Sequence, residues 1–145
     1  MIFTTSRLFV IACSALLGCS AALNLNFTEN QTMTRVGKEF PIKVGRQLKV
    51  EGADLQVKFI GVPQDSRCPT NVNCVWAGNA EVSLEWIVDK CPTSITLNTH
   101  ATSGVGDESK VGGFRVKLIK LEPYPHSEKK ISASDYTVTL LVIKE

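Results

Sequence analysis

The stretch Ala-Glu-Val-Ser-Leu-Glu-Trp-Ile-Val, residues 80–88, decides the fold class of this chain. Its apolar and polar side chains alternate one by one as far as Trp86, and a period of two residues is the pattern of a half-buried β-strand. An amphipathic helix would instead place apolar residues three and four positions apart. The stretch therefore predicts a β-strand that lies with one face on a hydrophobic core.

The same alternation recurs on both sides of this stretch, and Gly, Pro and Asp clusters fall between the alternating segments. No segment carries a helical stripe of three turns. Short strands at spacings near ten residues predict an all-β antiparallel sandwich of about seven or eight strands, Greek-key and immunoglobulin-like, with a small closed β-barrel as the alternative. The further alternating segments are 39–44, 47–51, 55–59, 94–98, 114–118 and 136–143.

Two of these segments carry information about their place in a sheet. Pro41 lies inside the first one, and because proline has no N–H to donate to a neighbour, this strand is expected at a sheet edge. The last segment adds Leu141 and Ile143 to its second face. A strand that is apolar on both faces is expected at the centre of a sheet, or under cover on both sides.

Length and charge limit the classes of function. A chain of 145 residues is expected to form one domain. Sixteen basic and fourteen acidic residues leave a formal charge of +2, which is too balanced to predict a nucleic-acid partner.

The N-terminus has the pattern of an export signal. Arg7 precedes an apolar run over residues 8–17, as in a secretory signal peptide. The run ends in Leu16-Leu17-Gly18-Cys19, which resembles a bacterial lipobox, and the resemblance implies cleavage before Cys19 and lipidation of its thiol. Ordinary signal cleavage near residues 20–22, which would discard Cys19, is the alternative.

These features divide the chain into three expected parts: a signal peptide over 1–18, a lipidated Cys19 with a flexible tether over 19–37, and a β-sandwich domain over 38–145. A short strand at 23–27 is the alternative for the beginning of the tether. Ser20 stands where aspartate would favour retention in the inner membrane, so the comparison with enterobacterial sorting favours the outer membrane. The protein is expected in a bacterial cell envelope, lipid-anchored and facing the periplasm.

The segment Asp65-Ser66-Arg67-Cys68-Pro69, followed by Cys74-Val75-Trp76-Ala77-Gly78-Asn79-Ala80, is the most distinctive part of the chain. It resembles a family of small uncharacterised bacterial envelope lipoproteins, and the likeness extends to Phe40–Gly45, Val57–Phe59, Pro123–Pro125 and Asp135–Tyr136. The resemblance supports the location and the fold, and it brings no activity with it.

This segment is expected to be a long loop closed by a disulfide. Five residues separate Cys68 from Cys74 in an oxidising compartment, so they are the favoured pair, and pairing of Cys74 with Cys91 is the alternative. Trp76 is expected to pack against the disulfide as part of the structure. The functional interpretation is a rigid binding loop that presents Asp65, Arg67, Asn71, Asn73 and Trp76.

Residues for chemistry are sparse. The cysteines do not have zinc-ligand spacing, and no Gly-x-Ser-x-Gly element marks a nucleophile, so we expect no metal, no cofactor and no catalytic residue. We expect a non-enzymatic binding or structural module with an envelope protein as its partner. An immunoglobulin-like inhibitor of envelope proteases is the alternative, and a hydrolase using His100 or His126 is a weaker one.

Overall fold

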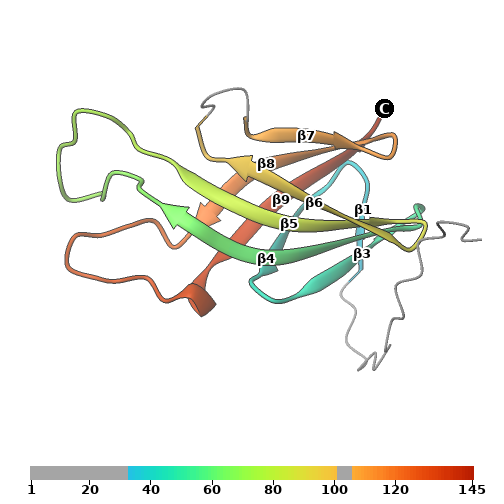
Figure 1. Cartoon of the computed structure of the whole chain (residues 1–145), viewed down its shortest axis with the longest axis horizontal. Helices are drawn as coiled ribbons and strands as arrows, with labels where there is room; N and C mark the ends of the chain where they lie inside the picture. Colours follow the sequence, from blue (N-terminus) through green and yellow to red (C-terminus); the bar gives the residue numbers. More distant parts are fainter. Residues whose placement is uncertain (1–32, 101–105) are drawn as a thin grey trace, which may run out of the picture.

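In the computed structural model, residues 33–100 and 106–145 are described, and they form two β-sheets that enclose one hydrophobic core (Figure 1). The two sheets remain separate in the strand order, so the expected all-β sandwich is confirmed and the closed-barrel alternative is wrong.

The first sheet has the strand order β1-β3-β4-β5-β6. Neighbouring strands within this sheet run antiparallel, except that β1 runs parallel to β3. The long hairpin of β4 and β5 is its centre. The strands are β1 (Met33–Arg35), β3 (Gln47–Glu51), β4 (Leu55–Asp65), β5 (Ala80–Val88) and β6 (Cys91–Asn98).

The second sheet is fully antiparallel and has the order β2-β9-β8-β7, so β2 lies at an edge as Pro41 predicted. A 3-10 turn, Ala133–Asp135, lies at the end of the connection from β8 to β9. The strands are β2 (Glu39–Lys43), β7 (Glu108–Val111), β8 (Phe114–Glu122) and β9 (Thr137–Lys144).

Two short strands were not expected from the sequence, β1 and β7. Because β1 begins at Met33, the first sheet starts inside the segment expected to be a tether, and the domain boundary expected at residue 38 is too late. Thr34 is buried there opposite Val50, and Arg35 forms an ion pair with Glu51 at 2.7 Å. Three residues are too few for an alternation pattern to reveal such a strand.

The core is built by the alternation that the sequence shows. In β5 the side chains of Val82, Leu84 and Trp86 point inward and are at most 1% exposed. The same core cluster contains buried side chains of both sheets, such as Phe59 of β4 and Leu140 of β9. One face of each sheet therefore carries the apolar side chains that stabilise the sandwich.

Strand β9 is central, as expected, between β2 and β8. Its burial nevertheless alternates: Val138, Leu140 and Val142 are buried, whereas Leu141 is only half-buried and Ile143 is 41% exposed. The second apolar face of this strand thus lies on the outside of the sandwich, and the alternative of cover on both sides is wrong.

Candidate functional site

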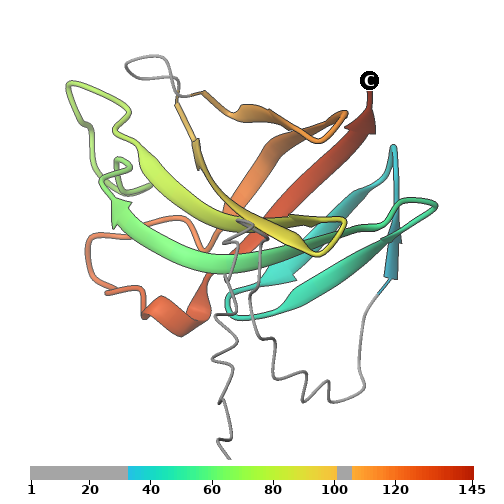
Figure 2. The same ribbon diagram turned by 45° about the vertical axis from the view of Figure 1, so that its right-hand side comes forward.

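Two loops project from the same end of the sandwich (Figures 1 and 2). The β4–β5 loop comprises residues 66–79, and the β8–β9 loop comprises residues 123–136. Both lie at the end opposite to the C-terminus in the two views. The binding residues expected from the sequence fall in the β4–β5 loop or at Asp65, where β4 ends.

Arg67 holds the base of the two loops together. Its Nε and one Nη donate hydrogen bonds to the Asp65 carboxylate at 2.9 and 2.6 Å. The remaining contacts cross to the second sheet, where the guanidinium donates to the carbonyls of Leu121 at 2.7 Å and Pro123 at 2.9 Å. The side chain is 2% exposed, and the guanidinium stacks on the Tyr124 ring at 4.8 Å.

Asp65 is the acceptor at the centre of this cluster. Besides Arg67, it accepts a hydrogen bond at 3.0 Å from the hydroxyl of Tyr136, which precedes β9. Burial raises the pKa of Asp65, but the hydrogen bonds and charge of Arg67 outweigh burial and hold the pKa below its ordinary value. Burial, followed by the hydrogen bond to Asp65, raises the pKa of Tyr136 to about 12. We call Asp65, Arg67 and Tyr136 the loop-base cluster.

The stem of the β4–β5 loop extends the hairpin beyond its strands. The Ser66 N–H donates a hydrogen bond to the Asn79 carbonyl at 2.7 Å. The Ser66 hydroxyl also donates to this carbonyl and accepts a hydrogen bond from the Asn79 N–H. The next bond runs from Cys68 N–H to Ala77 at 2.8 Å. Gly78 lies between them with φ +72°, and a Cβ there would overlap the Ser66 carbonyl. Only glycine fits this stem without strain.

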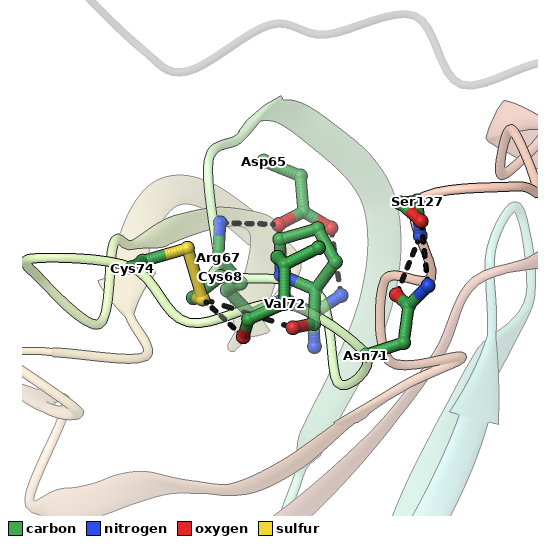
Figure 3. Close-up of a disulfide and its surroundings, with 8 residues drawn as sticks. Asp65, Arg67, Cys68, Asn71, Val72, Cys74 and Ser127 are labelled. Carbon is green, nitrogen blue, oxygen red and sulfur yellow. Dashed lines mark hydrogen bonds and ion pairs between the residues drawn. A yellow bond between two sulfur atoms is a disulfide. The ribbon is translucent and has the colours of Figure 1, made fainter.

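The expected disulfide joins Cys68 to Cys74, with the two Cα atoms 5.9 Å apart (Figure 3). It closes the outer half of the loop directly above the stem. The alternative pairing of Cys74 with Cys91 is therefore wrong, and Cys91 lies exposed at the start of β6. The short ring limits the conformations that the end of the loop can adopt.

Hydrogen bonds also connect the β4–β5 loop to the β8–β9 loop. The Thr70 N–H donates to the Pro125 carbonyl at 3.0 Å. The Asn71 amide donates to the Ser127 hydroxyl at 2.6 Å and accepts the Ser127 N–H at 3.0 Å (Figure 3). Asn71 thus links the two loops, and it was expected to contact a partner instead.

The end of the loop is apolar and exposed. Val75 is 87% exposed, Trp76 is 81% exposed and Val72 is 43% exposed. The expectation that Trp76 packs against the disulfide as part of the structure is wrong, and Trp86 is the tryptophan that the core buries. We call Val72, Asn73, Val75 and Trp76 the exposed tip.

The expected binding residues therefore have two different environments. Asp65 and Arg67 form buried contacts at the base of the loop, and Asn71 is held by Ser127. Asn73 and Trp76 are exposed at the end of the loop. Sequence reasoning missed Val75, although the absence of charged residues from position 68 to 79 could have revealed an apolar tip.

Two clefts flank the loop-base cluster. One of about 320 Å³ lies along β8 and includes Arg67, His100, Lys120 and Tyr124. Its wall is formed partly by Leu118 and Leu121. The other, of about 310 Å³, lies between the loops. It is lined by Asp65, Arg67, Pro69, Pro125, Lys129, Lys130, Ile131 and Tyr136.

Other expected features fall outside these elements. Cys19, the signal peptide over 1–18 and the segment 19–32 lie outside the described residues. Within residues 33–100 and 106–145, no helix is long and apolar enough to cross a membrane, and no three His, Cys, Asp or Glu side chains are grouped as metal ligands.

Comparison of the chain with protein-family models, with curated proteins and with solved structures finds no match.

Proposed function

We propose that the chain is a non-enzymatic, lipid-anchored binding module of a bacterial cell envelope that contacts its partner through the exposed tip. The observation that carries the proposal is the exposure of Val75 and Trp76, at 87% and 81%, on a loop whose base is fixed. Burying an apolar side chain is favourable, so leaving two neighbouring ones in water favours a contact surface. A rigid aromatic side chain binds at low entropic cost.

The fixation of the loop supports this proposal. The loop-base cluster, the Cys68–Cys74 disulfide and the Asn71–Ser127 pair each restrain a different part of the β4–β5 loop. None of these restraints covers the exposed tip. A loop held in this way presents its tip in one arrangement before binding, which lowers the ordering cost of association.

The edges of the sheets favour loops over strand addition as the means of contact. The edge strands β2 and β6 contain Pro41 and Pro92, and β1 and β7 are only three and four residues long. At the end of β6 the Asn98 N–H already donates to the Gly106 carbonyl at 2.9 Å. Proline and short length are the devices that prevent a sheet edge from pairing with another chain.

The anchor and the location rest on the N-terminal sequence. The positively charged Arg7, the apolar run over 8–17 and the lipobox-like Leu16–Cys19 support export and lipidation at Cys19. Ser20 supports the outer membrane, with the domain facing the periplasm. Lipoprotein anchors carry more than one acyl chain, which is sufficient for stable attachment.

Site-specific photo-crosslinking in intact cells tests the proposal. A photo-crosslinking amino acid replaces Asn73 in one variant, and in the control it replaces Thr96, which is exposed on β6 away from both loops. The proposal predicts a discrete crosslinked product from position 73 and none from position 96. Equal yields from both positions would show that the tip is not the contact surface.

A further inference from the structure

The chemistry of the exposed tip restricts the kind of partner. From Cys68 to Asn79 the loop contains no charged residue, and its three exposed apolar side chains project from one loop end. A stable protein interface needs about 800 Å² on each partner, with a core surrounded by polar residues. A small convex tip that carries tryptophan is instead typical of shallow insertion at a membrane surface, where the ring lies at the level of the headgroups.

Two adjacent basic side chains of the neighbouring loop lie at the same end of the domain. Lys129 and Lys130 are exposed, and they line the cleft between the loops together with Pro69 of the β4–β5 loop. Neither lysine has an ion pair within the described residues. The same loop also carries Glu128 and Asp135, but the Asp135 carboxylate accepts hydrogen bonds from the Ser132 N–H and the Ser134 hydroxyl within its own turn. Basic side chains beside an apolar tip attract anionic lipid headgroups.

We propose that the exposed tip inserts into the headgroup region of an anionic phospholipid bilayer, with Val75 and Trp76 reaching the acyl boundary and Lys129 and Lys130 against the phosphates. This inference rests on the proposed function and names the bilayer as the partner of the tip. An N-terminal lipid tether would allow the domain every orientation. A second attachment through the tip selects the orientation in which both loops face the membrane.

Quenching of tryptophan emission by brominated phospholipids tests the insertion. The full chain is added to vesicles of phosphatidylcholine alone or with phosphatidylglycerol. Any membrane binding by the apolar run over 8–17 is the same in every variant, so differences between variants report the tip. The chain has two tryptophans, and Trp86 is fully buried, so the Trp76→Phe variant measures the unquenched reference. The proposal predicts that brominated lipid removes about half or more of the Trp76 emission on anionic vesicles, as expected for a ring at the acyl boundary.

Two further variants separate insertion from other causes. Val75→Ser reduces the apolar surface beside the reporter and should lower the quenching of Trp76. Ile143→Ser is the matched control, because this residue is exposed on β9 at the opposite end of the sandwich, and it should leave the quenching unchanged. Replacing Lys129 and Lys130 together by glutamine should remove the preference for anionic vesicles.

Trp76 emission that is insensitive to brominated lipid on both kinds of vesicle would overturn the insertion. In that event, a protein crosslinked from Asn73 in cells would leave the proposed function standing with a protein as the partner. Absence of any crosslinked product as well would refute both proposals. Quenching that is equal for wild type and the double lysine variant would overturn the assignment of the headgroup contact.

Discussion

Replacing Arg67 by alanine removes the side chain that joins the base of the β4–β5 loop to the second sheet. Four hydrogen bonds disappear with it, two to the Asp65 carboxylate and one each to the carbonyls of Leu121 and Pro123. Asp65 would remain as a carboxylate that is only 10% exposed and has lost its counter-ion. The variant therefore leaves a largely buried carboxylate without a positively charged partner.

The magnitude follows from this arrangement. Breaking a buried ion pair by removing one partner costs about 3–5 kcal/mol. Asp65 keeps the hydrogen bond from Tyr136 and retains slight contact with water, so we expect the lower end, about 3 kcal/mol. A domain of this size has a free energy of unfolding of about 5–15 kcal/mol, so the variant should fold but unfold at much lower denaturant.

Urea unfolding followed by circular dichroism at neutral pH measures the effect. Arg35→Ala is the matched control, because it breaks an ion pair with Glu51 in which the arginine is 70% exposed. Such surface pairs contribute about 0.2–1 kcal/mol. A loss of less than about 1 kcal/mol in Arg67→Ala would refute the view that this side chain fixes the loop base.

The same cluster predicts a dependence on acid. The pKa of Asp65 is lowered in the folded protein, so its ionised form stabilises the fold above the ordinary carboxyl range. This contribution is lost as the pH falls through the folded pKa, and stability should decline below about pH 4. In Asp65→Asn the decline should be smaller, and an identical acid profile for both proteins would contradict the assignment.

Three further perturbations test the site. The pKa of Tyr136 is raised to about 12, so its protonated hydroxyl should stabilise the fold fully below about pH 10 and lose this contribution as the pH rises toward 12. Urea unfolding at several pH values should show this loss in the wild type and not in Tyr136→Phe. Gly78→Ala should cost about 3 kcal/mol or more in the same assay, because its new methyl group overlaps the backbone of the opposite stem strand. Gly45→Ala, with a similar φ but open space around it, should cost only about 1–2 kcal/mol. Replacing Cys68 and Cys74 together by serine should lower the free energy of unfolding by about 2.4 kcal/mol while the cooperative transition persists, and loss of that transition would make the disulfide a requirement of the core.

Alternation predicted the long strands because their burial is one-sided. The inward side chains of β5, from Ala80 to Trp86, follow the expected face one by one. The same signal failed for β1 and β7, which are too short to show a period. It also misled at Leu141 and Ile143, because an apolar side chain on the outer face of a sheet does not require cover.

The candidate site was predictable only where its contacts are local in sequence. The spacing of Cys68 and Cys74 is short enough to predict their disulfide, and it forms. The environment of Arg67 was not predictable, because two of its acceptors lie 54 and 56 residues further along the chain. Exposure of Trp76 likewise depends on how the loops are joined in three dimensions, and no periodicity reports that.

Trp76 is the central contact residue of the proposed exposed tip on a fixed loop. The decisive measurement is the yield of photo-crosslinking from Asn73 in intact cells, compared between the otherwise wild-type chain and Trp76→Ala. Because Trp76 is exposed, its replacement should leave the free energy of unfolding unchanged to within about 0.5 kcal/mol. If Trp76 makes the contact, its replacement should reduce the yield of crosslinked partner, lipid or protein, by about tenfold or more. An unchanged yield in a variant of unchanged stability would contradict this role of Trp76.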